Sequence, residues 1–195
     1  MLKKLQKNYS IIKIIFFIFL IFNIENQSIA ENIRNDKQLN KLFTQLKNIN
    51  DLSSAQIIEG KIWAIWEKHP TQDTLTKSLS VGTEFMNAGQ FVMAYNLFSN
   101  IIKKDPSWAE SWNKRATLLY IMNRYQSSLA DIKETLALEP RHFGALSGQA
   151  LNYIELEEYE KAIGSLKDAQ KIYPVIDAAK KMIPQLKEII NNQAI

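Results

Sequence analysis

Three prolines at a fixed interval constrain this chain more than any other feature. Pro106, Pro140 and Pro174 lie 34 residues apart. Proline donates no backbone hydrogen bond and forces the residue before it toward an extended conformation, so each of these prolines is predicted to end a helix. A repeat of this length is typical of stacked helical hairpins. The stretch from Leu75 to Pro174 is therefore predicted to be an all-α array, a class of fold that binds other molecules.

Most of the excess positive charge of the chain lies in its first thirty residues. The net charge is +4, from 24 Lys and Arg against 20 Asp and Glu. Residues 1–30 hold four of the lysines and one glutamate, so the remainder carries 20 basic and 19 acidic residues, a net charge of +1. A single-stranded nucleic acid needs a basic groove with interleaved aromatic side chains, and this charge balance argues against one.

The N-terminus has the pattern of a secretory signal. Four lysines precede an unbroken apolar run at 14–22, and Ser28-Ile29-Ala30 places small residues at the two positions that determine cleavage. The apolar run is shorter than the roughly 20 residues that cross a bilayer. Residues 1–30 are predicted to be a signal peptide that is removed, with an uncleaved membrane anchor as the alternative. The rest of the chain is then exported, to the periplasm if the source is a Gram-negative bacterium.

The segment 38–70 is predicted to form a helix pair ahead of the prolines. Apolar residues recur at helical spacing, turn formers occupy 48–54, and Ser53 or Ser54 can cap the second helix before His69-Pro70 stops it. The pair is predicted to be a degenerate first hairpin that caps the array. Trp63 and Trp66 have two interpretations, an aromatic binding surface or large side chains covering the open end of the stack, and the second is favoured.

Small and large residues recur with the same period as the prolines. The small ones lie where the two helices of a hairpin approach: Gly82, Ala116 and Ala150 in the first helices, with Ala94, Ser128 and Ala162 in the second. The large ones fill the spaces between helices: Phe85, Leu119 and Tyr153; Phe91, Tyr125 and Tyr159; Phe98, Ile132 and Leu166. A larger side chain at a small site would overpack the hairpin.

This pattern resembles the tetratricopeptide repeat (TPR) family. The resemblance implies a right-handed solenoid of antiparallel helix hairpins, within a single TPR domain that spans 31–195. Its predicted parts are the degenerate hairpin, three full repeats and a capping helix: 38–70, 75–106, 109–140, 143–174 and 175–191. Pro184 is predicted to kink or divide the capping helix. The strings 61–66 and 139–150 also resemble a group of small exported bacterial TPR proteins that has no assigned activity.

Few residues suggest chemistry. The chain has no cysteine, which excludes disulfides, thiolate metal sites, cysteine nucleophiles and attachment through a lipid-modified cysteine. Its two histidines, His69 and His142, have no second histidine or carboxylate at helical ligand spacing, and His142 is predicted to be a partly exposed residue at a repeat junction. No cofactor, metal or catalytic group is predicted.

The concave surface formed by the first helices of the repeats is the predicted binding site. Its side chains are mostly neutral, and the candidates are Thr83, Met86, Asn113, Thr117, Tyr120, Ser147, Leu151 and Ile154. Chaperone-binding members of the TPR family hold a carboxylate with a clamp of lysine, asparagine and arginine. The corresponding sites here are Leu79, Thr83, Lys114, Gly144 and Gly148, of which only the lysine can bind a carboxylate. A groove of this kind suits an apolar or weakly polar peptide, or a helix.

The leading functional prediction is an exported TPR adaptor that binds a partner protein or peptide in the cell envelope. The same groove side chains could also simply face water. A structural protein that self-assembles through its apolar ends is the second interpretation, and an enzyme with an unrecognised site is the third and weakest. No nucleic acid partner is expected, and the only predicted membrane contact is an uncleaved signal segment.

Overall fold

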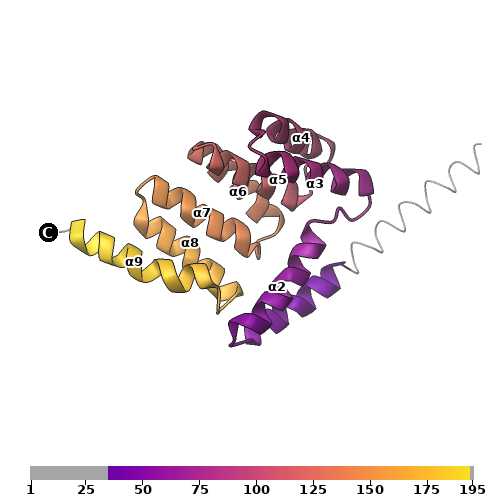
Figure 1. The fold of residues 1–195 in the computed structure, drawn as a ribbon. Coiled ribbons are helices and arrows are strands. Elements are labelled where there is room, and N and C mark those ends of the chain that lie inside the picture. The colour runs from indigo at the N-terminus through magenta and orange to yellow at the C-terminus, as the bar shows by residue number, and fades with distance from the viewer. Residues whose placement is uncertain (1–34, 194–195) are drawn as a thin grey trace, which may run out of the picture. The chain divides into compact units, whose positions relative to one another are not determined.

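A computed structural model describes residues 35–193, and the segment from Leu39 onward belongs to one compact unit. Residues 35–48 are helical, and no strand occurs within the described range. The helices that follow are α2 (Leu52–Trp66), α3 (Asp73–Asn87), α4 (Phe91–Lys104), α5 (Ala109–Ile121), α6 (Tyr125–Leu138), α7 (Phe143–Glu155), α8 (Tyr159–Ile172) and α9 (Asp177–Gln193) (Figure 1). The predicted all-α array of hairpins is confirmed: α3–α4, α5–α6 and α7–α8 succeed one another, and α9 packs on α8.

The small residues lie where two helices of a hairpin touch. In the first hairpin, a Cβ added to Gly82 would be 2.5 Å from Cε1 of the fully buried Phe98 ring, so a larger residue would displace that ring. In the second hairpin, the Ser128 hydroxyl donates to the carbonyl oxygen of Ala116 over 2.8 Å. The two helices of a hairpin are thus held close together by ring packing in the first repeat and by a buried hydrogen bond in the second.

Each of these hairpins turns through a residue with positive φ. Gly89, Asn123 and Glu157 have φ of 73°, 57° and 58° and are spaced by the repeat length. Glycine adopts this conformation readily and asparagine tolerates it, whereas glutamate is strained in it. In each turn the next backbone N–H donates over 2.8 Å to a carbonyl in the last turn of the first helix, which closes that helix.

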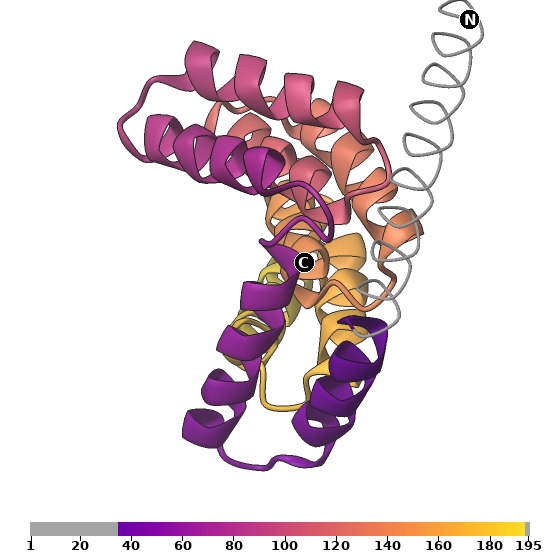
Figure 2. The same cartoon turned by 90° about the vertical axis from the view of Figure 1, so that its right-hand side faces the viewer.

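The N-terminal hairpin packs at a different place from the predicted one. Its buried face joins a single hydrophobic cluster with the third repeat and α9, in which the Phe143 ring contacts both Trp66 and Tyr173. The cluster of the first repeat contains no buried side chain from residues 39–66. The first repeat carries Ser78 where the later repeats have Trp112 and Leu146, so this position gives the hairpin no large apolar side chain to pack against. Figure 2 shows α2 at the level of the orange and yellow C-terminal helices, below α3 and α4.

One local prediction about a helix end is wrong, and of the two outcomes predicted at Pro184, a kink or a division of the helix, the division does not occur. Asp51, and neither Ser53 nor Ser54, caps α2: its carboxylate accepts from the backbone N–H of Ser54 over 2.8 Å. The Asp51 carboxylate, which precedes the expected serines, accepts the capping hydrogen bond. Its negative charge also interacts favourably with the positive end of the helix dipole. Pro184 lies within α9 and does not divide it. Its position is exposed, so the carbonyl that loses its helical partner can bind water.

Candidate functional site

A pocket of about 210 Å³ opens between α5, α6 and α7. We call it the groove pocket. Five of the predicted site residues contribute to its walls: Asn113, Thr117, Tyr120, Ser147 and Leu151. The rest of the lining comes from Ala116, Ser128, Ile132, Gly144, Ala145, Gly148 and Asn152. These further residues are mostly small, and the repeat pattern assigned Ala116, Ser128 and Ile132 to packing inside a hairpin. Small side chains at these positions leave room for a pocket between the helices. Their recurrence in the sequence was the signal from which this part of the lining could have been predicted.

The other three predicted site residues lie elsewhere. Thr83 lines a second depression of about 320 Å³ between α3 and α5, the outer pocket. Met86 is buried in the hydrophobic cluster of the first repeat, and Ile154 packs against the cluster of the third. The predicted surface is therefore divided, and its central part holds most of the candidates.

Two asparagines form part of the polar wall of the groove pocket. Asn113 is buried, and its amide donates to both carboxylate oxygens of Glu110, over 3.3 and 3.2 Å. Asn152 is 1% exposed, and its amide donates to the Ser128 hydroxyl over 3.0 Å and to the Gly148 carbonyl over 2.8 Å. Among the described residues, the Oδ1 atom of Asn152 has no hydrogen-bond partner. A buried acceptor without a donor costs free energy, and this one lies beneath the accessible surface of the pocket.

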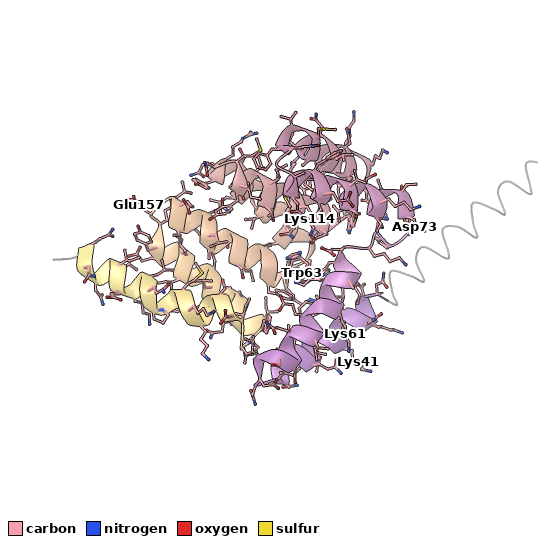
Figure 3. All side chains as sticks on the ribbon, viewed as in Figure 1. Lys41, Lys61, Trp63, Asp73, Lys114 and Glu157 are labelled. Carbon is pink, nitrogen blue, oxygen red and sulfur yellow. The ribbon has the colours of Figure 1, made fainter. Side chains whose placement is uncertain are left out.

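The N-terminal hairpin crosses the concave surface beside the groove pocket. Trp63 covers Gly144, where an added Cβ would be 2.6 Å from the Cη2 atom of the indole. The same ring lies 5.9 Å from the Lys114 ammonium, and the Glu67 carboxylate pairs with Lys114 over 2.7 Å (Figure 3). Both Lys114 and Gly144 occupy sites that correspond to the carboxylate clamp. The hairpin therefore occupies the region where that clamp would lie.

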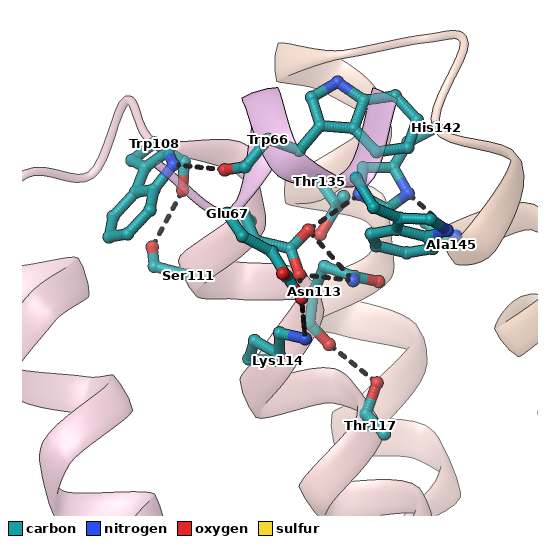
Figure 4. A network of polar contacts seen from close by, with 12 residues as sticks. Trp66, Glu67, Trp108, Ser111, Asn113, Lys114, Thr117, Thr135, His142 and Ala145 are labelled. Atoms are coloured by element: carbon teal, nitrogen blue, oxygen red, sulfur yellow. Dashed lines mark hydrogen bonds and ion pairs between the residues drawn. The ribbon is translucent and has the colours of Figure 1, made fainter. Parts of the chain in front are cut away.

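A buried polar network lies beneath this contact (Figure 4). The fully buried Glu110 carboxylate accepts from His142 Nε2 over 3.0 Å and pairs with the Lys114 ammonium over 3.4 Å. His142 Nδ1 accepts from the backbone N–H of Ala145 over 3.0 Å and so caps α7. Because Nδ1 accepts a hydrogen bond, the ring proton lies on Nε2. The Trp66 indole stacks on the imidazole, with centroids 4.1 Å apart.

The structure corrects the prediction for His142. Its exposed fraction is 0%, and its carboxylate partner comes from a neighbouring repeat, 32 residues away in the sequence. Helical spacing cannot reveal a pair of this kind. His69 is similar: it is 2% exposed, and Nε2 lies 2.8 Å from the Asp105 carboxylate. Both histidines hold the hairpin and its linker against the repeats.

Lys114 remains charged in this setting. Burial alone would lower the pKa of Lys114, but the Glu110 and Glu67 carboxylates outweigh that effect and hold the pKa above its ordinary value. Its ammonium is therefore satisfied by two carboxylates of the chain itself. A carboxylate from another molecule would have to compete with both.

A third depression, of about 290 Å³, lies between α2, α7 and the start of α9. We call it the hairpin pocket; Glu59, Trp63, Tyr173 and Asp177 contribute to its walls. The Glu59 carboxylate accepts from the Trp63 indole N–H over 3.3 Å and from the Tyr173 hydroxyl over 3.1 Å. Burial, together with the charges of Glu59 and Asp177, raises the pKa of Tyr173 far above its usual range. The phenol stays neutral and donates to Glu59.

Residues 35–193 contain no cluster of metal ligands. No group of three or more His, Asp or Glu side chains in that range is arranged to hold a metal ion. None of the helices described there has the length and apolar character needed to cross a membrane. The predicted signal at 1–30 lies outside the described residues.

The architecture is that of a repeat protein built from helix hairpins, and a sequence relative identifies the family. A TPR repeat-containing protein of Rhizobium etli is 31% identical over 152 residues, which cover 78% of this chain and 74% of the relative. The chain therefore belongs to the TPR repeat-containing proteins, as its sequence pattern indicates. No protein-family model matches it.

Solved TPR structures share the fold at low sequence identity. The first TPR of Spaghetti (RPAP3), bound to the HSP90 peptide SRMEEVD, aligns with a TM-score of 0.58 at 14% identity, over 60% of this chain and 93% of that one. The Yersinia enterocolitica type III secretion chaperone SycD, in complex with a peptide of the translocator YopD, aligns with a TM-score of 0.54 at 14% identity, over 64% and 95%. These similarities establish the fold alone.

Proposed function

We propose that this protein is an exported adaptor that holds a segment of a partner protein in the groove pocket. The observation that carries the proposal is the groove pocket itself: a cavity of about 210 Å³ on the concave side, lined by residues from α5 and α7 that the repeat pattern places there. Two structurally similar TPR proteins are seen with bound peptides, which supports the same use of the fold here. Export rests on the signal pattern of residues 1–30.

The groove pocket suits a short segment better than a small metabolite. It is shallow, its walls are neutral side chains and backbone, and no ionised side chain lines it. Ligand pockets for drug-sized molecules have volumes of about 300–1,000 Å³ and enclose most of the ligand, so this one is small. A side chain from an extended or helical segment fits such a volume, while the rest of the segment lies along the concave surface.

Blocking the groove pocket is expected to abolish partner binding. Thr117 is exposed at its rim, so Thr117→Trp fills the groove with a neutral ring and leaves the core intact. We expect affinity capture and cross-linking from envelope extract to recover a partner with the wild type and to lose it with Thr117→Trp. With the purified partner, the dissociation constant is expected to rise at least about tenfold, or 1.4 kcal/mol.

The matched control is Gln126→Trp, which adds the same ring at an exposed position of α6 outside the groove pocket. It is expected to bind the partner as the wild type does. Equal recovery of the same partners by both tryptophan variants would contradict the proposal, as would recovery of none by the wild type.

Self-assembly is the second candidate, and one observation favours it. The N-terminal hairpin leaves the first repeat uncapped, and Val81 and Val92 are 41% and 70% exposed there. Light scattering after gel filtration tests the idea: self-assembly predicts a mass above that of one chain, reduced to one chain by Val92→Ser. A single-chain mass at high concentration would exclude it.

A further inference from the structure

The groove pocket itself presents no charged group to a ligand. Its walls are neutral side chains and backbone. The Oδ1 atom of Asn152 has no partner among the described residues, but it has almost no accessible surface, so a bound ligand does not reach it. Any preference for the charge of the ligand is therefore set by the side chains beside this pocket.

The charges around the concave surface are mainly negative. Glu59 and Asp177 line the hairpin pocket, and Glu67 and Glu84 line the outer pocket. The single cation among the residues that line the three pockets, Lys114, already pairs with Glu67 and Glu110. The free charge presented to a ligand is therefore negative, although the chain as a whole is basic.

Negative charge also borders the far rim of the groove pocket. There the Tyr120 and Tyr125 hydroxyls donate to the exposed Glu155 carboxylate, over 3.3 and 3.1 Å. These neutral donors orient that carboxylate and leave its charge in place. A segment that extends along the groove in either direction therefore meets carboxylates.

The hairpin pocket adjoins the groove pocket, because Gly144 and Ser147 line both. Its Glu59 carboxylate is held by two neutral donors and has no ion-pair partner within residues 35–193. The half-buried Trp63 ring forms part of the same wall. Carboxylates beside an aromatic ring are the surroundings that a lysine or arginine side chain prefers.

Asp177 adds a second carboxylate to this pocket. Its pair with Lys181 is between exposed side chains, 45% and 69% accessible. Exposed ion pairs of this kind contribute little and exchange readily with other cations. Asp177 can therefore turn to a cation that enters the pocket.

We infer, building on the proposed function, that the bound segment is basic: a lysine or arginine side chain enters the hairpin pocket, and a neutral part of the segment lies in the groove pocket. The cationic head lies between Glu59 and Asp177, and its aliphatic stem lies along Trp63. An acidic segment would meet carboxylates in the hairpin pocket, in the outer pocket and at Glu155, and only a lysine that is already paired.

A selection from random twelve-residue displayed peptides tests this inference and requires no identified partner. The full chain, Thr117→Trp and Gln126→Trp serve as parallel baits. We expect peptides enriched on the wild type and on Gln126→Trp to contain lysine or arginine, and to be absent from the Thr117→Trp selection. Enrichment of neutral or acidic peptides that is still lost in Thr117→Trp would overturn the basic segment and leave the adaptor function standing. No enrichment beyond that of Thr117→Trp would overturn both.

The strongest selected peptide then tests the hairpin pocket directly. The double variant Glu59→Gln, Asp177→Asn is expected to weaken its binding at least about fivefold at low salt, with a smaller difference at high salt because screening shortens the range of the attraction. Glu134→Gln with Glu160→Gln makes the same charge change at exposed positions of α6 and α8 and is expected to bind as the wild type does. Equal weakening by both double variants would show a general charge effect and overturn the assignment of the pocket.

Discussion

A Trp66→Ala variant is expected to lose about 3–5 kcal/mol of the free energy of unfolding, the range for truncating a buried tryptophan. Trp66 is 7% exposed at the centre of the contact between the N-terminal hairpin and the third repeat. It stacks on His142 and lies 5.1 Å from the Phe143 ring, centroid to centroid. The cavity left by its removal cannot close without moving both elements. Chemical denaturation followed by circular dichroism measures the loss.

Two further variants isolate the cause. Trp66→Phe keeps an aromatic ring and removes an indole N–H that has no partner within residues 35–193, so its loss is expected to be about 1.5 kcal/mol or less. Trp112→Ala makes the same truncation at a half-exposed tryptophan, whose indole N–H donates to the Pro106 carbonyl, and is expected to lose clearly less than Trp66→Ala. Equal losses in Trp66→Ala and Trp112→Ala would contradict the hairpin docking seen here.

The repeats could be predicted from the sequence because their information is local and periodic. The prolines, the small sites such as Gly82 and the large sites such as Phe98 recur every 34 residues, and each acts on a neighbour in its own hairpin. The docking of the N-terminal hairpin could not be predicted in this way. It depends on the fit of Trp66 against residues about 80 positions later, for which periodicity gives no signal.

The candidate site was predicted only where a side chain belongs to one repeated helix face. Thr117 and Leu151 line the groove pocket because their positions on the first helices face the concave side. Asn152 was missed because the repeat pattern does not distinguish it from a solvated neighbour. Glu59 was missed because its role depends on α2 lying beside Tyr173, 114 residues away in the sequence.

A Lys114→Met variant is expected to lose about 3 kcal/mol or more of the free energy of unfolding, since it leaves the Glu110 carboxylate fully buried without its lysine. Adding Glu110→Gln removes the buried charge, so the double variant is expected to be more stable than Lys114→Met alone.

The exposed pair of Lys161 and Glu158 supplies the control: Lys161→Met is expected to change stability by about 0.5 kcal/mol or less. Denaturation of the four proteins beside the wild type, with Glu110→Gln completing the cycle, gives the coupling free energy. A Lys114→Met loss no larger than that of Lys161→Met would show that the network adds nothing, and the hairpin would then be held across the groove by its apolar contacts alone.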